Sequence, residues 1–419
     1  MIKILVLNVG KSNKGNCALV SSTVRTISNY IPNVQFQFIG PDTIHSNEFN
    51  IERWPGIISI RKPYETIISF LYLLECIYIN FSYKLNINVS PSKKWKLINF
   101  YNSDIIINSG GDTISGEGGI STLTPLLNIL YATLLHKPVV LYGESLGYFK
   151  NKPINIIAKF VLNTTSLIIL RENLSRKYLL DNNIINPKIY VTSDPAFLLD
   201  PAPQSVVSEI FKKEGIRESE ENRPLIGINP SGLISRFLEN TEQTGQQKIK
   251  NTMSKVVDNL IENLDANILM VPHVYTSGSD DRLSIKNILK DVKHKSNVYI
   301  VENEYTAQEL KGIIGRCDLF IGMRMHSTIA STSMLVPTVG IAYSHKMHGI
   351  IGNMLGQNKY IVDINNFGYD QLISTIYECW DNRDIIKKEL EIKIPQVKEK
   401  ALFNGELVKE LLSNCHKIN

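Results

Sequence analysis

An arginine and a histidine two positions apart, Arg324 and His326, are the residues best suited to chemistry. They follow residues 317–321, an apolar run that predicts a buried strand, and they open the next helical pattern. The N–H groups and the dipole of a helix N-terminus favour an anion. A guanidinium adds a planar fork for carboxylate or phosphate, and an imidazole transfers protons near neutral pH. The pair therefore predicts a site for a small anion; the alternative is a capped sheet edge beside an ordinary core histidine.

Further charged residues come directly after other predicted strands. Tyr343 and Lys346 follow one of them, so Lys346 is a second candidate for holding a phosphate. Arg171 follows another and could supply a third positive charge, although a structural ion pair would explain it nearly as well. Asp194, which precedes a proline, is expected to cap a turn rather than to catalyse.

Two loops rich in glycine and asparagine follow the first and fourth predicted strands, at residues 8–18 and 109–119. Glycine lets a ligand approach the backbone closely, whereas carboxylates such as Asp112 and Glu117 can bind sugar hydroxyls or accept a proton. Simple turns are the alternative for both loops. The loop residues expected to contact a substrate are Asn13, Gly15, Gly110, Gly111 and Glu117.

Two familiar binding motifs are incomplete in this sequence. The Gly-Lys-Ser at 10–12 lacks the earlier glycine of a phosphate-binding P-loop, because Leu5 stands there. His345 and His348 are spaced for a metal pair but have no acidic residue nearby to complete a ligand set. We therefore expect neither a P-loop nor a metal site.

Residues 143–147 match the G-x-S-x-G nucleophile elbow and follow a predicted strand. The elbow requires a helix to begin at once, and the sequence that follows does not favour one, so we interpret the motif as a glycine-lined turn. The rival interpretation is a serine hydrolase with Ser145 as nucleophile and His326 or His273 as base.

Length and composition limit the class of protein. At about 150 residues per domain, 419 residues predict two or three domains, and we take two. The net charge of +5, from 45 basic and 40 acidic residues, is too small to indicate nucleic-acid binding but is compatible with a small anionic substrate. Five scattered cysteines predict reduced thiols in the cytosol, and the N-terminus is expected to form a strand rather than a signal peptide.

The elements that must position these residues are alternating strands and helices. Continuous apolar runs separated by helix-length patterns are typical of parallel sheets buried on both faces. The predicted strands are 2–7, 34–39, 57–60, 104–108, 138–142, 167–170 and 189–192, then 225–229, 267–271, 298–301, 317–321, 338–342 and 360–362. The fold class is therefore α/β, with two Rossmann-like, doubly wound domains expected to face each other across a ligand-binding cleft, a GT-B-like arrangement.

The domain boundary is expected in residues 201–224, where prolines and charges interrupt the apolar rhythm and predict a linker. This linker would separate an N-terminal domain, 1–200, from a C-terminal domain, 225–395. Residues 396–419 are predicted to form a C-terminal helix.

Residues 66–83 are an unusually apolar helical segment within an insert at 64–101. Nine of these 18 residues are Ile, Leu or Phe, and the single charge is Glu75, which makes a clean transmembrane span unfavourable. Lys84 and a Lys-Lys-Trp-Lys run at 93–96 follow, and this mixture favours an anionic membrane surface. A buried core helix followed by a solvated basic loop is equally compatible with the sequence.

Taken in order, these segments resemble the polysaccharide pyruvyl transferase family. The resemblance covers residues 5–355, departs at Asn16, where members commonly carry aspartate, and is interrupted by the insert. Its motifs are an N-x-G-[DN] loop at 13–16, Gly-Gly-Asp at 110–112, G-x-S-x-G at 143–147, Arg171-Glu172 with Ser175, Asp194-Pro195-Ala196, and Arg324-Met325-His326 with residues 343–346.

What the resemblance implies is transfer of a pyruvyl group from phosphoenolpyruvate to a sugar of a cell-surface polysaccharide or its precursor, with formation of a ketal and release of phosphate. By analogy, Arg324 and Arg171 would hold the donor, His326 would bind it and protonate its methylene carbon, and Asp112 is the first choice of base. The C-terminal domain would bind the donor, and the N-terminal domain the acceptor, a sugar or lipid-linked saccharide. Such an enzyme needs no cofactor, and we expect it in the cytoplasm, with peripheral membrane contact as one prediction.

Other classes of function stay open. A nucleotide-sugar-dependent glycosyltransferase with two Rossmann-like domains would use similar Arg and Lys residues for a diphosphate. A serine hydrolase would use Ser145, and a non-catalytic sugar-binding protein would keep the glycines without needing Arg324 and His326 together.

Overall fold

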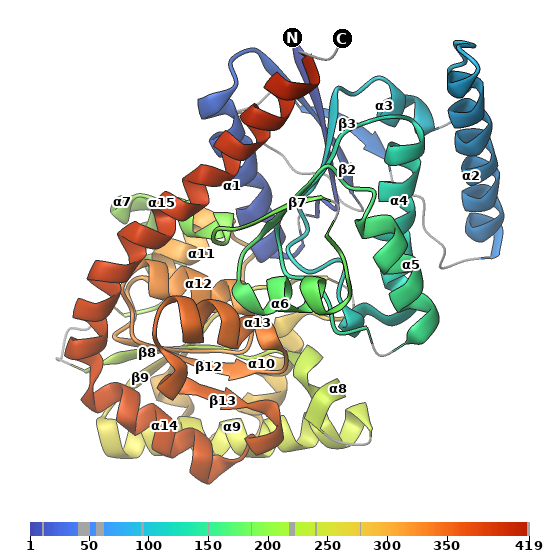
Figure 1. Ribbon diagram of the computed structural model, residues 1–419. Coiled ribbons are helices and arrows are strands. Elements are labelled where there is room, and N and C mark those ends of the chain that lie inside the picture. Colours follow the sequence, from blue (N-terminus) through green and yellow to red (C-terminus); the bar gives the residue numbers. More distant parts are fainter. Residues whose placement is uncertain are drawn as a thin grey trace. The chain divides into compact units, whose positions relative to one another are not determined.

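The computed structural model (Figure 1) describes residues 1–419 except 11, 41–50, 56–62, 94–95, 150, 186, 218–222, 239–240, 277 and 417–419. The chain forms two compact units. The first unit comprises Met1–Lys11, Leu19–Pro195 and Lys400–Asn419, and the second comprises Ser12–Ala18 and Ala196–Glu399. Neither unit is one continuous stretch of chain.

A parallel sheet of seven strands forms the centre of the first unit, in the order β3-β2-β1-β4-β5-β6-β7. Its central strands bury both faces, as their continuous runs of Val, Ile and Leu require. The strands are β1 (Ile2–Leu7), β2 (Val34–Gly40), β3 (Ile51–Pro55), β4 (Ile105–Asn108), β5 (Val139–Glu144), β6 (Leu167–Leu170) and β7 (Lys188–Val191).

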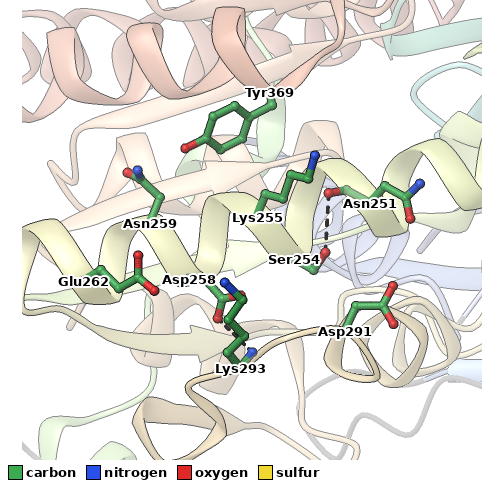
Figure 2. Close-up of a pocket in the computed structure, with 9 residues that line it drawn as sticks. All are labelled: Asn251, Ser254, Lys255, Asp258, Asn259, Glu262, Asp291, Lys293 and Tyr369. Atoms are coloured by element: carbon green, nitrogen blue, oxygen red, sulfur yellow. Dashed lines mark hydrogen bonds between the residues drawn. The ribbon is translucent and has the colours of Figure 1, made fainter.

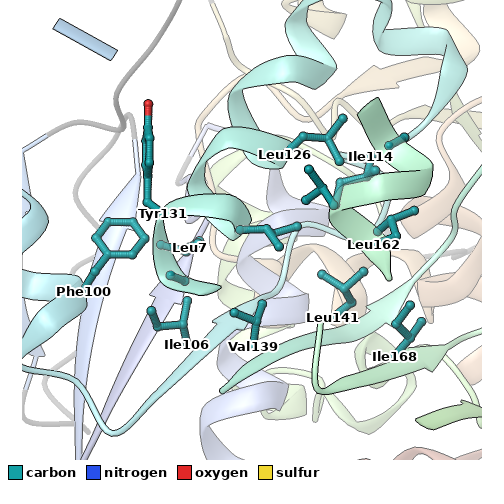
Figure 3. Close-up of a cluster of buried hydrophobic side chains, with 14 of the residues drawn as sticks. Leu7, Phe100, Ile106, Ile114, Leu126, Tyr131, Val139, Leu141, Leu162 and Ile168 are labelled. Atoms are coloured by element: carbon teal, nitrogen blue, oxygen red, sulfur yellow. The ribbon is translucent and has the colours of Figure 1, made fainter. Parts of the chain in front are cut away.

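Helices cover both faces of this sheet, which confirms the predicted doubly wound arrangement for the first unit. Alternate strand residues point to opposite faces, so Leu7 and Leu141 join one hydrophobic cluster, part of which Figure 3 shows, and Ile4 and Val6 join the other. The first cluster lies beneath α2 (Pro63–Lys84), α3 (Leu97–Tyr101), α4 (Leu123–Leu134), α5 (Lys152–Leu162) and α6 (Asn173–Asp181), and the second beneath α1 (Lys14–Tyr30) and the last part of α15 (Arg383–His416).

The second unit repeats this plan with six parallel strands in the order β10-β9-β8-β11-β12-β13. Within this unit α11 and α12 lie on one side of the sheet, and α9 and α14 on the other (Figure 1). The strands are β8 (Leu225–Asn229), β9 (Asn267–Met270), β10 (Val298–Ile300), β11 (Leu319–Gly322), β12 (Thr338–Ala342) and β13 (Ile361–Asp363). The helices are α7 (Gln204–Lys213), α8 (Ser235–Leu238), α9 (Glu242–Leu264), α10 (Asp281–Leu289), α11 (Ala307–Ile314), α12 (Met325–Ser333), α13 (His345–Met347) and α14 (Tyr369–Asp381).

The predicted strands agree with the observed ones to within two residues at each end, except near β3. The sequence analysis did not predict β3, and the strand predicted at 57–60 lies outside the described residues. β3 is an edge strand, and Glu52 and Arg53 interrupt its apolar character. Charged residues are common at such edges because they discourage pairing with other chains.

The stretch predicted as a linker, 201–224, contains α7 and belongs to the second unit, whose main segment begins at Ala196. Val207, Ile210 and Phe211 bury one face of α7 in the core of that unit. Of the charges that suggested a linker, Glu209, Lys212 and Lys213 belong to this amphipathic helix, and residues 218–222 lie outside the described residues. The helix predicted at 396–419 is the last part of the longer α15.

The apolar segment 66–83 lies within α2, which packs against α4 on one side only. Tyr72, Cys76 and Ile79, spaced about one turn apart, are buried in the cluster that α4 shares. Only 28% of the most apolar 18 residues of α2 is buried, so of the two alternatives a buried core helix does not describe most of its surface. By length and composition alone, α2 could cross a membrane. In the basic stretch that follows, Lys94 and Trp95 lie outside the described residues.

Candidate functional site

Polar residues at the carboxyl ends of β8 and β11 organise a site in the second unit. β8 ends at Asn229, whose side-chain oxygen accepts hydrogen bonds from the backbone N–H of Arg324 (3.2 Å) and from the Ser327 hydroxyl (2.9 Å). Arg324 is the N-cap of α12, so these bonds fix where the helix begins. Asn229 was not among the predicted site residues, because an asparagine at a strand end has no distinctive sequence signal.

The guanidinium of Arg324 is held by Asp281, the first residue of α10. Nη2 lies 2.7 Å from Oδ1 of Asp281 and also donates to the carbonyl and hydroxyl of Ser279. The second carboxylate oxygen of Asp281 accepts from the backbone N–H groups of His273 and Val274. Burial raises the pKa of Asp281, and the guanidinium opposes that shift. Within the described residues, Arg324 donates its hydrogen bonds through Nε and Nη2. The remaining nitrogen, Nη1, is therefore the one best able to donate to a ligand.

The start of α1 meets α12 in the same unit. The side-chain oxygen of Asn13 accepts from the Gly15 N–H (3.0 Å) and so caps α1, and the Lys14 N–H donates to the His273 carbonyl (3.1 Å). A Cβ at Gly15 would lie 2.2 Å from Nδ1 of His326. Glycine is therefore required for the close approach, and the N-termini of α1 and α12 converge at His326.

Positive charge concentrates around this point. Lys14 is buried, its Nζ lies 2.6 Å from Oε1 of Glu304, and it stands 5.1 Å from the centre of the Tyr275 ring. Burial lowers the pKa of His273 to about 3, with further contributions from the positive charges of His326, Arg324 and Lys14, so His273 is neutral at physiological pH. Helix N-termini, lysine and arginine are groups that favour an anion, and two such termini lie together here with Lys14 and Arg324. The sequence analysis missed Lys14, although it lies inside the N-x-G motif.

The loop after β12 presents its predicted residues differently from expectation. Tyr343 stacks on Phe237, with ring centroids 5.1 Å apart, and Nζ of Lys346 stands 5.4 Å from the centre of the Tyr343 ring. Lys346 is only 2% exposed, so its ammonium group lies against the aromatic ring, and its contact with a phosphate stays a prediction. Nearby, His348 pairs with Asp363 (2.7 Å), and among the described residues no three His, Cys, Asp or Glu side chains gather as metal ligands.

In the first unit, Arg171 forms the centre of a second polar cluster. Its Nη1 lies 2.6 Å from Oδ2 of Asp194, and its Nε donates to the Ser145 hydroxyl (2.8 Å). The side chain is 1% exposed and forms the structural ion pair that the sequence analysis gave as the alternative, whereas contact of Arg171 with the donor stays a prediction. Gly111, at a φ of +75°, lies so close that a Cβ there would be 2.9 Å from Nη1 of Arg171. Gly111 thus packs the loop onto the guanidinium.

The G-x-S-x-G segment is a turn, as we interpreted it. Ser145 is fully buried, and its N–H donates to the Gly111 carbonyl (2.7 Å). No helix begins after the serine, since α5 starts at Lys152. Gly143 and Gly147 have φ values of 65° and 118°, a region that favours glycine, and a Cβ at Gly147 would lie 2.4 Å from the Tyr178 ring.

Glu144 is the residue of this cluster that sequence reasoning missed. Its Oε1 accepts from Nδ2 of Asn108 (2.6 Å) and from the Gly110 N–H (3.0 Å). Its Oε2 is buried and has no hydrogen-bond partner in the part of the chain that the structure describes. Burial raises the pKa of Glu144 to about 8, against the opposing charge of Arg171 and with a smaller contribution from Asp112. Glu144 is therefore largely protonated at neutral pH, in contact with the Gly-Gly loop.

Of the two carboxylates predicted for the site in the first unit, the structure describes the side chain of Asp112 but not that of Glu117. Asp112 is half-buried and lies close enough to Arg171 to raise the pKa of that guanidinium. The backbone of Glu117 belongs to the 3₁₀ helix Gly116–Thr122, but its side chain lies outside the described residues.

A cavity of about 510 Å³ lies elsewhere in the second unit, along α9 (Figure 2). It is lined by both signs of charge, including Lys255, Lys293 and Glu262. One of its carboxylates, Asp258, already accepts from the backbone N–H groups of Lys293 and His294. This cavity holds none of the predicted site residues and does not belong to the site.

The sequence profile of the polysaccharide pyruvyl transferases matches residues 13–345. The chain belongs to this family. The match begins at Asn13, which caps α1, and ends one residue before Lys346. All other predicted site residues lie within the pyruvyl transferase profile.

One relative and several solved structures are similar to this pyruvyl transferase family member. The amylovoran biosynthesis protein AmsJ of Erwinia amylovora is 25% identical over 277 residues, which span 66% of this chain and 65% of that protein. A glycosyltransferase from Rickettsia africae superposes with a TM-score of 0.60 at 15% identity, covering 99% of both chains. A UDP-N-acetylglucosamine 2-epimerase named as putative, from Listeria monocytogenes, gives 0.61 at 10% identity, covering 100% of this chain and 97% of that one.

These structural likenesses show the fold alone. They confirm the predicted α/β class with two Rossmann-like, GT-B-like domains. The predicted ligand-binding cleft stays a prediction.

Proposed function

We propose that the protein transfers a pyruvyl group from phosphoenolpyruvate to a saccharide of a cell-surface polysaccharide or its precursor. The observation that carries this proposal is the convergence of the α1 and α12 N-termini at His326, beside Lys14 and Arg324. Phosphoenolpyruvate bears a carboxylate and a phosphate close together, and such an arrangement suits both groups. Family membership supplies the reaction class.

In the proposed reaction, His326 donates a proton to the methylene carbon of phosphoenolpyruvate. The neighbouring carbon then becomes electrophilic, and a saccharide hydroxyl forms a bond to it and loses its proton to a base. A second hydroxyl displaces the phosphate, which leaves with its bonding electron pair, and the proton of that hydroxyl returns to His326, so that a cyclic ketal results. Lys14 and Arg324 would stabilise the negative charge that develops on the phosphate. No cofactor or metal is needed, because the donor carries its own leaving group.

The loops at the strand ends of the first unit are proposed to bind the acceptor. Asp112 is the proposed base, because it is a half-buried carboxylate next to Gly110 and Gly111. Arg171 and Glu144 are positioning residues in this scheme, since both are fully buried and bond to that loop or its neighbours. The proposed compartment is the cytoplasm, which suits the thiols of Cys76, Cys317 and Cys379.

The proposal is tested by calorimetric titration with phosphoenolpyruvate and by transfer of its labelled pyruvyl group to an acceptor saccharide. Arg324→Ala should weaken donor binding by about 2–5 kcal/mol, because a desolvated anion loses its charged partner. Thermal unfolding of the variant must be measured in parallel, since Asp281 would be left buried without its arginine. Binding of UDP-sugars without binding of phosphoenolpyruvate would replace this proposal by a glycosyltransferase.

A further inference from the structure

The face of α2 that points away from α4 is a continuous apolar surface. Exposed large side chains follow one another along the helix, with exposed fractions of 40–62%. With 22 residues, α2 is about 33 Å long, so this face exceeds the apolar patches common on soluble monomers. Its members, here called the α2 face, are Tyr64, Ile67, Ile68, Phe70, Leu71, Leu74, Ile77, Tyr78 and Phe81.

The single charge in the middle of α2 lies at the border of the α2 face, since Glu75 is seven residues from Ile68 and four from Leu71. Its Oε1 accepts a hydrogen bond from the Ser92 N–H (3.0 Å), and its Oε2 is buried. Glu75 is therefore bonded to the insert and only partly exposed beside the apolar side chains. The carboxylate of Glu75 made a transmembrane span unfavourable, but its bond to Ser92 lowers the cost of placing the α2 face at a membrane surface.

A second exposed apolar face belongs to the same helical layer. α4 contacts both α2 and α5, and α5 exposes Ile156, Ile157 and Phe160. Exposed lysines accompany both faces. They are Lys84, Lys93 and Lys96 after α2, and Lys152 and Lys159 on α5.

We propose that the α2 face, together with α5, docks on an anionic lipid bilayer. The helix would lie along the bilayer surface with its apolar side chains among the acyl chains, because its other side is fastened to α4 through Tyr72, Cys76 and Ile79. The neighbouring lysines complement the negative headgroups. A lipid-linked saccharide would then meet the enzyme at the bilayer, a consequence that rests on the proposed function, whereas the docking itself does not.

The test is flotation of the full chain with phosphatidylcholine vesicles that do or do not contain phosphatidylglycerol. We expect binding to the anionic vesicles that salt weakens. The variant Ile67→Ser/Leu74→Ser/Phe81→Ser, whose residues share one helix face at seven-residue spacing, should bind at least about a hundredfold less tightly. These side chains are exposed, so melting temperature and transfer to a soluble acceptor should be unchanged.

The matched control is Ile385→Ser/Ile392→Ser on α15, which removes two side chains of similar exposure, 59% and 65%, at the same spacing. It should bind vesicles as the parent does. Failure of the parent to float with anionic vesicles at low salt overturns the proposal. A second outcome also overturns it: the parent is a dimer that does not bind vesicles, and the α2 variant is a monomer. The α2 face would then be an interface between two copies of the chain. Vesicle binding without any turnover of phosphoenolpyruvate would overturn only the proposed function.

Discussion

Replacing Gly15 by alanine tests whether the N-termini of α1 and α12 form one working site. A Cβ at residue 15 would lie 2.2 Å from Nδ1, 2.5 Å from Cγ and 2.7 Å from Cβ of His326. The last distance matters most, because rotation of the imidazole leaves the Cβ of His326 in place. The backbone of α1 or α12 must therefore move by about 1 Å to restore ordinary van der Waals separation.

A displacement of that size has a predictable cost. Misplacement of a reacting group by about 1 Å lowers the rate by about a hundredfold, or about 2.7 kcal/mol of transition-state stabilisation. Overpacking destabilises the fold by about 1–3 kcal/mol, and the better helix propensity of alanine offsets up to about 1 kcal/mol of it. We expect kcat/KM for phosphoenolpyruvate to fall about a hundredfold in Gly15→Ala, while the melting temperature falls by a few degrees.

The assay follows phosphate release from phosphoenolpyruvate in the presence of acceptor, together with thermal unfolding. Gly368→Ala is the matched control, because Gly368 also stands at a helix start, at the N-cap of α14, and a Cβ there meets nothing within 4 Å. Activity of Gly15→Ala within threefold of Gly368→Ala would refute the reasoning. The convergence of the two helices at His326 would then have no part in catalysis.

Three further predictions concern single side chains. Arg324→Lys keeps a charge beside Asp281 but loses the planar fork, so the Kd for phosphoenolpyruvate in calorimetry should rise at least about tenfold, and an unchanged Kd would remove Arg324 from the donor site. Ser145→Ala should keep activity within about tenfold of the parent, since the hydroxyl accepts a bond from Arg171; covalent labelling of Ser145 by a fluorophosphonate would contradict this. Burial raises the pKa of Glu144 to about 8 in the folded protein, from 4.5 for an ordinary glutamate. The folded state therefore binds this proton more tightly than the unfolded state does. The resulting stabilisation is complete below about pH 4.5 and is lost as the pH rises towards 8. The melting temperature of Glu144→Gln should therefore change less between pH 5 and 8 than that of the parent, and equal slopes would count against a protonated Glu144.

The sequence predicted the strands well because a strand buried on both faces consists of a continuous run of apolar residues. The runs at 105–108 and 167–170 contain almost nothing but Ile and Leu, and apolar runs of that length favour a buried strand over a helix. β3 has no such apolar run, because an edge strand tolerates charged residues such as Glu52 and Arg53. α7 was interpreted as a linker for a related reason: its buried residues are few and stand among charges.

The candidate site was predictable in its residue types but not in their burial. A position after a strand places Arg171 and Lys346 at the correct edge of a sheet, yet nothing local reveals that Asp194 or the Tyr343 ring covers them. The contact between Gly15 and His326 joins residues more than 300 positions apart, and no spacing rule reaches that far. Glu144 was hidden because it stands inside a motif that suggested a nucleophilic serine.

The path of α15 has a consequence for how the protein is made. Leu407, Val408 and Leu412 complete the hydrophobic cluster that contains Ile4 and Val6, and Gly405 lies within close reach of the α1 backbone at Thr26. The strands that open the sequence therefore keep one apolar face uncovered until residues near 412 have left the ribosome. Domains usually fold as they emerge, N-terminal first, but this one must wait until about residue 412 is made, which takes about 20 s at the fastest synthesis rates and about 80 s at the slowest. During that interval a growing chain exposes the apolar side chains of β1 and α1. We therefore expect chaperones to bind the growing chain until α15 covers them.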